Sequence, residues 1–189
     1  SSHELAQGYK EVTDISVYIK FKLKPGQKIG NFTTDDKTHI LSWTTTPWTL
    51  PANVALAVGK DIEYRKVTIT RGEHDGEVYI LTTTRIADTF RRSGVFDLGE
   101  RLDGNEEING FMDIGTAIKG KDLIGLEYEP LFDVPALKSK TSYKIYDAKF
   151  VTTTDGTGVV HTAVMYGEDD YNLGKEIGLP QHHTVDEQG

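Results

Sequence analysis

A single segment, WTTTPWTLPAN at residues 43–53, carries hydroxyls, an amide and two indoles at the predicted end of a strand. Pro47 has no N–H group for a sheet, so the strand that enters from residues 39–43 is predicted to stop there. Hydroxyl and amide groups can hold a small polar ligand by hydrogen bonds while an aromatic ring covers it. The candidate ligand-binding residues of this segment are Trp43, Thr44, Thr45, Thr46, Trp48, Thr49 and Asn53.

The chain contains its own comparison for this segment, because threonine triplets recur at residues 82–84 and 152–154. At those two places the β-propensity of threonine and its use as a helix cap are sufficient explanations. The first triplet has a similar ordinary alternative, a Thr-rich strand that ends at a proline turn. The residue types alone therefore leave a ligand site and a simple strand end open.

A second segment, DGTGVVHTAVMYGEDDY at residues 155–171, combines a predicted tight turn, a histidine and a run of acids. Gly156 and Gly158 permit the turn, and the apolar pair that follows predicts a short strand with His161 at its end. A single histidine after an apolar strand is more often structural than catalytic. Residues 168–170, Glu-Asp-Asp, open a predicted helix, where the helix dipole favours acids, so N-terminal capping explains them equally well.

Two familiar kinds of site are excluded by the surroundings of these residues. Residues 156–158, Gly-Thr-Gly, lack the third glycine and the preceding strand-turn-helix context of a dinucleotide-binding fingerprint. His161 has no second histidine or cysteine at a metal-binding spacing, and His182 and His183 lie in a predicted exposed loop. We therefore expect neither a metal site nor a cofactor.

The composition limits the classes of protein that the chain can represent. Its 189 residues suffice for one domain with a substantial core, and no apolar run approaches the ~18 residues that cross a bilayer. The absence of cysteine excludes disulfides, thiol nucleophiles and zinc ribbons, and it is typical of the cytoplasm, where we expect the protein. The net charge of −8 argues against a broad nucleic-acid surface, so any nucleic-acid contact is expected only with a short end.

The hydrophobic patterns predict a chain that is mostly β with a few helices, an α+β protein. Many short strands would leave exposed edges, so we expect a closed or nearly closed β-barrel-like core with peripheral helices. Residues 93–122 indicate no clear element. The predicted strands are residues 15–23, 39–43, 54–58, 63–70, 77–81, 142–150 and 158–163, and the predicted helices begin near Thr84 and run from Glu168 to Ile177.

The two segments together resemble the editing domain of isoleucyl-tRNA synthetase, the insertion called connective peptide 1. LIGLEYEPLF at residues 123–132 and the closing VDEQG are also similar to that family, so the resemblance covers nearly the whole chain. Leucyl- and valyl-tRNA synthetases carry related insertions, but Pro47-Trp48 is typical of the isoleucyl branch. Val164 stands where relatives often have a proline. We expect residues 1–189 to be a single domain of a larger synthetase, with linker-like ends at 1–10 and 182–189.

The resemblance implies a hydrolytic task. A hydrophobic pocket separates isoleucine from valine by one methylene, worth only about 1–3 kcal/mol, so a second site hydrolyses the smaller product. The implied reaction is attack of water on the aminoacyl ester of Val-tRNA(Ile), with valyl-adenylate as a further substrate. The implied partners are the valine-carrying 3′ end of tRNA(Ile) and the rest of the synthetase. The chain lacks the His-Ile-Gly-His and Lys-Met-Ser-Lys-Ser signatures, so it is not expected to activate amino acids.

The resemblance also implies roles for the residues that stand at the positions of the family's motifs. Asp170 would hold the α-ammonium group of the substrate by a charge-assisted hydrogen bond. The triplet at residues 44–46 would position the ester, the terminal ribose and the attacking water, so these threonines and Asp170 are the implied catalytic residues. His161 would admit valine and refuse isoleucine, while Glu168 and Asp169 would cap the helix. The residues implied to line the adenosine or amino-acid side of the pocket are Trp43, Trp48, Thr49 and Asn53.

Two other functions stay open at this point. The chain could be a valyl- or leucyl-type editing domain that acts on threonyl or methionyl esters. It could also be a non-catalytic β-barrel insertion that binds the end of a tRNA or docks another protein. A suitable residue stands at every motif position expected of an active site, which favours the catalytic alternatives.

Overall fold

Two β-sheets form the framework of the chain, for which the computed structural model describes residues 15–92 and 112–186. The five-stranded sheet has the order β1 (Val17–Lys22), β4 (Thr38–Thr44), β7 (Val78–Thr82), β6 (Glu63–Ile69) and β8 (Met112–Lys119). The three-stranded sheet has the order β10 (Val159–Thr162), β5 (Ala55–Val58) and β9 (Lys144–Asp147). A short hairpin pairs β2 (Lys28–Ile29) with β3 (Phe32–Thr33).

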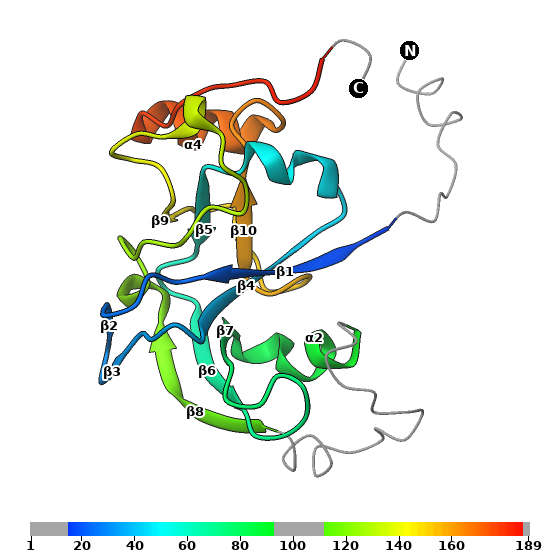
Figure 1. Cartoon of the computed structure of the whole chain (residues 1–189), viewed down its shortest axis with the longest axis vertical. Helices are drawn as coiled ribbons and strands as arrows, with labels where there is room; N and C mark the ends of the chain where they lie inside the picture. Colours follow the sequence, from blue (N-terminus) through cyan, green and yellow to red (C-terminus); the bar gives the residue numbers. More distant parts are fainter. Residues whose placement is uncertain (1–14, 93–111, 187–189) are drawn as a thin grey trace.

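Helices are few and short in the described part of the chain. The α-helices are α2 (Ile86–Arg92) and α4 (Glu168–Ile177), and the 3₁₀ turns are η1 (Pro47–Ala52), η2 (Thr83–Arg85), η4 (Gly120–Asp122) and η5 (Pro135–Leu137). In Figure 1 the three-stranded sheet and α4 occupy the upper half, while β6, β7, β8 and α2 occupy the lower half. The prediction of a mostly β chain with a few helices is confirmed.

The position of each strand in its sheet agrees with its sequence pattern. β7 and β5, which have neighbours on both sides, read VYILT and ALAV and are buried at every residue. β1 lies at the edge of its sheet and alternates the buried Ile19 and Phe21 with lysines. Charged residues on an edge strand discourage pairing with another chain.

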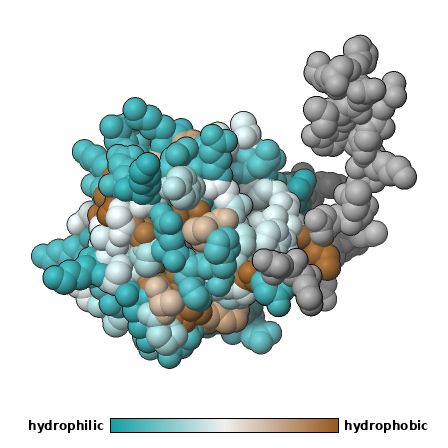
Figure 2. Space-filling view, turned by 90° about the horizontal axis from the view of Figure 1, so that it is seen from above, coloured by the Kyte–Doolittle hydropathy of each residue, from teal (hydrophilic) through white to brown (hydrophobic). Residues whose placement is uncertain are grey.

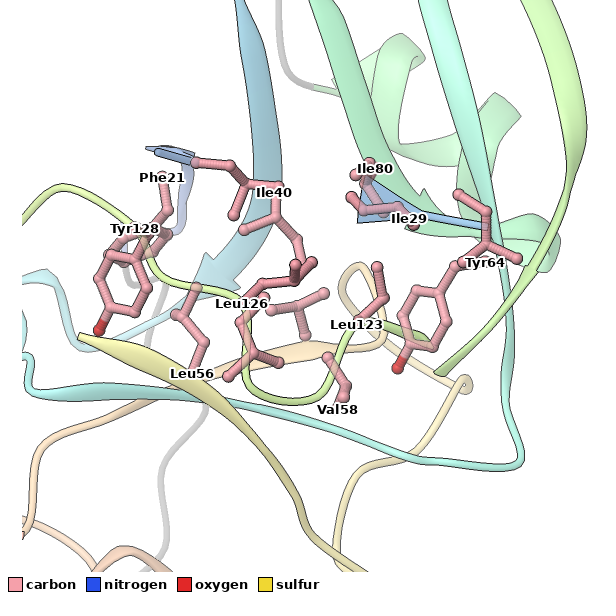
Figure 3. Packing of buried hydrophobic residues seen from close by; sticks show 14 of the residues in the cluster. Phe21, Ile29, Ile40, Leu56, Val58, Tyr64, Ile80, Leu123, Leu126 and Tyr128 are labelled. Atoms are coloured by element: carbon pink, nitrogen blue, oxygen red, sulfur yellow. The ribbon is translucent and has the colours of Figure 1, made fainter. Parts of the chain in front are cut away.

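The main hydrophobic core lies between the two sheets. Ile40 and Ile80 of the five-stranded sheet pack in one cluster with Leu56 and Val58 of the three-stranded sheet. Figure 3 shows Tyr128 and Tyr64 at opposite ends of this cluster, with the hydroxyl oxygen of Tyr128 turned away from the apolar side chains. The core residues thus hold the two sheets together, and the two tyrosines bring polar groups to its margins.

The predicted closed or nearly closed barrel is wrong. In the described part of the chain β1 and β8 are the edges of the five-stranded sheet, and no ladder joins them. The two sheets bury their apolar faces against each other and leave both edges open, because packing in layers removes apolar surface without closure. Outside the ladders, isolated bridges pair Leu23 with Tyr128 and Glu127 with Lys144.

Most predicted elements are confirmed to within one or two residues at each end, and the differences have local causes. The strand predicted at 142–150 is reduced to β9, because Tyr143 adopts a φ of 58° that a strand cannot continue. β8 falls in the region without a clear signal, where only Met112 and Ile118 of its eight residues are buried. The rest of that region up to 111, and the linker-like end predicted at 1–10, lie outside the described residues.

The surface agrees with the high content of charged residues. Figure 2 shows hydrophilic residues over most of the face seen from above, with hydrophobic residues in small separate groups. None of the helices in the described ranges is long and apolar enough to cross a membrane.

Candidate functional site

The first predicted segment forms the end of β4 and a tight turn. Thr44 is the last residue of β4 and is buried; its Oγ1 accepts a hydrogen bond from the Thr46 N–H at 3.0 Å and lies 3.2 Å from Thr46 Oγ1. The Thr45 and Thr46 side chains are exposed. Pro47 opens η1, so the predicted stop of the strand at this proline is confirmed. Two threonine side chains thus face solvent at a rigid strand end.

The second segment begins with the predicted glycine turn. Gly156 and Gly158 have φ values of 68° and 73°, which side chains with a Cβ rarely adopt. A Cβ on Gly158 would lie 2.9 Å from Cβ of Thr82, and one on Gly156 would lie 3.2 Å from the indole of Trp43. The turn therefore packs closely against both the half-buried Trp43 and β7 before β10 begins.

The strand β10 brings the two segments together. Ser42 in β4 donates a hydrogen bond from Oγ to the carbonyl of Val159 at 2.9 Å, although the two residues are 117 positions apart. Thr157 Oγ1 donates to the carbonyl of Leu41 at 2.6 Å. β10 also pairs with β5, which follows η1 directly. The threonine turn and the histidine segment consequently meet at one place in the fold.

His161 is held inside this junction. Its side chain is buried, with Nε2 at 2.8 Å from Thr49 Oγ1 and Nδ1 at 3.4 Å from the amide nitrogen of Asn53. Thr49 Oγ1 in turn donates to the carbonyl of Thr46 at 2.8 Å. Burial lowers the pKa of His161 to about 4, so the imidazole is neutral near pH 7. Thr49 and Asn53, both predicted to line a pocket, use their polar atoms within the protein.

Asp170 lies in the first turn of α4 and points toward the end of β10. Its Oδ2 accepts a hydrogen bond from the Ala163 N–H at 3.2 Å. Burial raises the pKa of Asp170 to about 6, against a smaller lowering effect of that hydrogen bond, and the neighbouring Asp169 raises it further. No lysine or arginine of the described ranges forms an ion pair with this carboxylate.

The two acids before Asp170 differ from it. Glu168 and Asp169 are exposed, and Gly167 is the N-cap residue of α4 with no side-chain capping hydrogen bond. Both acids lie in the first turn of the helix, as predicted. Their interaction with the helix is limited to the dipole at its N-terminus.

Val164, the residue that stands where relatives often have a proline, packs α4 onto the loop before it. Its side chain is buried, and a Cβ on Gly174 would lie 2.7 Å from Val164 Cγ2. The Tyr166 N–H donates to the Ala163 carbonyl at 2.9 Å, which closes the turn around Val164. The missing side chain of Gly174 thus makes room for the valine, and Asp170 is positioned by the same contact.

An aromatic cavity adjoins the site and contains residues that the sequence did not single out. The cavity has a volume of about 730 Å³ and is lined by Trp48, Tyr166, His183, Thr184, Val185 and Asp186. Trp48 is 56% exposed, and its ring centroid lies 5.6 Å from that of Tyr166 in an edge-on arrangement. Of the two indoles predicted to cover a ligand, Trp48 lines this cavity beside Tyr166, and Trp43 is not among the lining residues.

The end of the described chain is fastened to this cavity. The Tyr166 hydroxyl accepts hydrogen bonds from the Thr184 N–H at 2.8 Å and the Val185 N–H at 3.1 Å. His182 and His183 are exposed, as predicted. Part of the segment predicted to be a linker-like end, 182–189, is therefore anchored up to residue 185. Within the described ranges no group of three or more His, Cys, Asp or Glu residues is arranged to hold a metal ion.

The other two threonine triplets lie in different surroundings. Thr82 ends β7 and donates to the Glu63 carbonyl at 3.0 Å, while Thr83 donates to the Glu63 carboxylate at 3.0 Å. No side-chain cap forms at η2, so β-structure rather than capping accounts for this triplet. Thr152 and Thr154 contact each other at 3.1 Å in an irregular segment and are exposed.

The chain is similar to known proteins over its full length. No family model matches the chain. Over its full length it is 41% identical to the isoleucine–tRNA ligase of Clostridium novyi and 38% identical to isoleucine–tRNA ligase 2 of Bacillus cereus. It spans 15% of the length of each of these curated relatives.

Solved structures with a similar fold have low sequence identity. The CP1 domain GlLeuRS-CP1 is 17% identical, with a TM-score of 0.60 that covers 86% of this chain and 60% of that chain. The cytosolic leucyl-tRNA synthetase editing domain of P. knowlesi is 16% identical, with a TM-score of 0.60 over 91% of this chain and 65% of that chain. The chain therefore matches one segment of isoleucine–tRNA ligases over its whole length, and it has the fold of leucyl-tRNA synthetase editing domains.

Proposed function

We propose that this segment is an editing domain that hydrolyses the aminoacyl ester of Val-tRNA(Ile), with valyl-adenylate as a second substrate. The observation that carries the proposal is that β10 links an exposed hydroxyl turn, bonded to His161 through Thr49, to a partly buried carboxylate that is bonded to Ala163 and has no cationic partner among the described residues. A cationic substrate group and an ester next to it would fit these two features. The partners of the domain are then the 3′ end of tRNA(Ile) and the rest of the synthetase.

Asp170 supplies the recognition of the α-ammonium group. A carboxylate whose pKa burial raises to about 6 is destabilised in its charged form, so a bound cation would stabilise it. Hydrogen bonds between an ammonium and a carboxylate are roughly twice as strong as neutral ones. The charge of the substrate would therefore restore a stable ionised Asp170, which gives the site a preference for aminoacyl esters over simple esters.

The threonine turn positions the reacting groups. Thr44 is committed to the turn through its bonds to Thr46, which leaves Thr45 and Thr46 exposed for contacts with the ester, the terminal ribose and water. Alcohols are not strong bases near neutral pH, so their contribution is orientation of a water molecule toward the ester carbonyl carbon. A ribose hydroxyl of the terminal adenosine is a suitable group to assist the water.

His161 and the aromatic residues determine which side chain is accepted. A buried neutral imidazole with both nitrogens engaged is a rigid, uncharged boundary for an aliphatic side chain. Trp43 and Trp48 would line the adenosine or amino-acid side, with Thr49 and Asn53 behind His161. One methylene in such a pocket changes the free energy of binding by about 1–3 kcal/mol.

A deacylation assay tests this proposal. The 189-residue chain, in excess over tRNA under single-turnover conditions, is expected to hydrolyse Val-tRNA(Ile) and to leave Ile-tRNA(Ile) intact. A preference for threonyl esters would indicate a valyl-type domain, and a preference for methionyl esters a leucyl-type domain. Binding of the tRNA end without hydrolysis of any ester would contradict the catalytic proposal and favour a binding module.

A further inference from the structure

A fully buried tyrosine outside both motifs is connected to His161 by hydrogen bonds. The Tyr128 hydroxyl donates to Asn53 Oδ1 at 2.7 Å, and Asn53 Nδ2 donates to the carbonyl of Ala55 at 3.0 Å. The amide of Asn53 is therefore oriented from two sides. A backbone carbonyl can only accept a hydrogen bond, so Nδ2 has to face Ala55, and the tyrosine hydroxyl holds the oxygen on the other side.

The orientation of this amide determines the tautomer of His161. Nδ1 of the imidazole faces Asn53 Nδ2 at 3.4 Å, and an amide nitrogen can only donate, so Nδ1 has to be the acceptor. The ring proton is then on Nε2, which donates to Thr49 Oγ1 at 2.8 Å. Thr49 Oγ1 is left to donate its own hydrogen to the Thr46 carbonyl at 2.8 Å. Each group in this series thus donates a hydrogen bond to the next, from the Tyr128 hydroxyl to the Thr46 carbonyl.

We propose that Tyr128 is a positioning residue of the editing site, which fixes the tautomer and ring orientation of His161 through Asn53 and thereby holds the Thr46 end of the hydroxyl turn. The role in editing rests on the proposed function above, whereas the control of His161 follows from the geometry alone. Tyr128 touches none of the groups expected to react, so its effect passes entirely through these side chains.

The surroundings of Tyr128 make it a rigid starting point for the chain of bonds. Its ring packs edge-on against Phe21 at 5.3 Å and against Tyr143 at 6.0 Å, and its backbone N–H donates to the carbonyl of Tyr143. Figure 3 shows the ring at one end of the main core with the hydroxyl directed away from the apolar side chains. The hydroxyl can therefore be removed without a change in the packing of the ring.

Removal of the hydroxyl would release the amide of Asn53. Its oxygen would be buried without a donor, which is unfavourable for a polar group, and only the Ala55 carbonyl would still oppose rotation of the amide. In the rotated amide the oxygen faces His161 Nδ1 and stabilises the other tautomer. Nε2 then becomes an acceptor from Thr49, whose hydroxyl no longer donates to Thr46.

The tautomer of His161 can be read directly from the ¹⁵N chemical shifts of the imidazole in the 189-residue chain at pH 7. The wild type is expected to show a single form with the proton on Nε2. In Tyr128→Phe a substantial fraction of the Nδ1–H form is expected. A wild type with the proton on Nδ1, or a Tyr128→Phe variant with an unchanged spectrum of His161, would overturn the proposal.

Two other tyrosines provide matched controls. Tyr143→Phe removes a buried hydroxyl that makes no hydrogen bond with the described residues and lies in the ring contact next to Tyr128. Tyr64→Phe removes a hydroxyl that donates to the Gly158 carbonyl at 2.6 Å at the opposite end of the core. Both variants should keep the wild-type tautomer. A change of tautomer in Tyr64→Phe as large as in Tyr128→Phe would mean that general loosening of the core, not Tyr128, controls His161.

Deacylation rates separate this inference from the proposed function. Tyr128→Phe should lower the single-turnover rate on Val-tRNA(Ile) by roughly fivefold, which matches the loss of one net hydrogen bond. In an Asn53→Ala background the same change should have no further effect, because the connection is already cut. An additive loss in that background would contradict the pathway through Asn53. An inactive wild type with the expected tautomer shift would refute the function and still support the control of His161.

Discussion

The threonine triplets at residues 44–46 and 152–154 have nearly the same internal contact and very different surroundings. In each, the hydroxyls of the first and third threonines lie close together, at 3.2 Å in the first triplet and 3.1 Å in the last. The first triplet lies at the end of β4 and is connected through Thr49 to the buried His161. The last one lies in an irregular segment in which Thr152 and Thr154 are exposed.

This difference shows where the chemistry of a hydroxyl cluster comes from. The same local contact forms in both of these triplets, so the cluster alone does not make a site. Preorganised positioning requires that the groups behind the cluster are themselves fixed. Only at residues 44–46 are such groups present, since His161 and Thr49 are buried and bonded to each other.

Replacement of each triplet by alanines gives the largest expected effect. Alanines at residues 44–46 remove all the groups that position ester and water, so the single-turnover rate on Val-tRNA(Ile) should fall by at least about a thousandfold, since one transition-state hydrogen bond alone is worth about 10²–10³. Alanines at 152–154 should leave the rate within about twofold. Both variants are checked for folding by urea unfolding. Equal losses of activity in the two variants would remove the functional distinction between the triplets.

A carboxylate near each triplet extends the comparison. Asp170→Asn should lower the rate by about a hundredfold, because a charge-assisted bond to the α-ammonium group is lost. Asp155→Asn, at the exposed acid directly after the last triplet, should have no effect. Asp169→Asn tests the choice within α4, since Asp169 is exposed in the same helical turn. Loss of activity in Asp169→Asn with an active Asp170→Asn would show that the other acid binds the substrate.

Specificity should change by a smaller factor when His161 is replaced. If its ring fills the space that the extra methylene of isoleucine needs, His161→Ala should hydrolyse Ile-tRNA(Ile), and discrimination should fall by roughly 10–200-fold. The same change leaves Thr49 and Asn53 with lost partners, so the free energy of unfolding should drop by about 1–3 kcal/mol. His182→Ala, at an exposed histidine, is the control. An isoleucyl ester still refused by folded His161→Ala would place the barrier elsewhere, with Trp48 as the next candidate.

Local patterns in the sequence were sufficient for the parts of the fold that depend on neighbouring residues. The proline stop at Pro47, the glycine turn at residues 156–158 and the helix Glu168–Ile177 were all predicted, because each depends on the conformational limits of a few residues. The prediction of a barrel was wrong, since closure depends on whether β1 and β8 meet, which no local pattern records. β8 was missed for the same reason, because its pairing with β6 rather than its own alternation makes it a strand.

The candidate site also has residues that the sequence indicated and residues that it did not. Its motif residues were visible in the sequence, and the structure brings His161, Thr49, Asn53 and Thr46 into contact. Tyr128, between two glutamates in LEYEP, and Tyr166, directly before GEDD, were not singled out as site residues, because neither pattern indicates which group the tyrosine hydroxyl contacts. Their hydroxyl partners are 75 residues away for Tyr128 and 18 residues away for Tyr166. Contacts over such separations are set by tertiary packing and cannot be deduced from one sequence.

The pH dependence of the deacylation rate gives the smallest expected effect, and it distinguishes Asp170 from His161. Asp170 has to be ionised to bind the α-ammonium group, and its pKa is raised to about 6, so the rate should fall about tenfold from pH 7.5 to pH 5. His161 has a pKa of about 4 and stays neutral over this range, so it should not contribute to the change. His161→Gln should therefore leave the midpoint of the pH–rate profile near pH 6.

The raised pKa of Asp170 also affects the free energy of unfolding, in the opposite direction to its effect on the rate. Protonation of Asp170 at low pH lowers the rate but stabilises the folded state. The folded chain holds the proton of Asp170 up to about pH 6, whereas an unfolded chain releases it near pH 4, so the folded state binds more protons between these values. The free energy of unfolding should therefore decrease as the pH rises from 4 to 6, and Asp170→Asn should remove this part of the slope. A wild type and an Asp170→Asn variant with parallel unfolding curves by urea titration between pH 4 and pH 7 would show that Asp170 is solvated like Asp155, and the reason for assigning it to the substrate's cation would be lost.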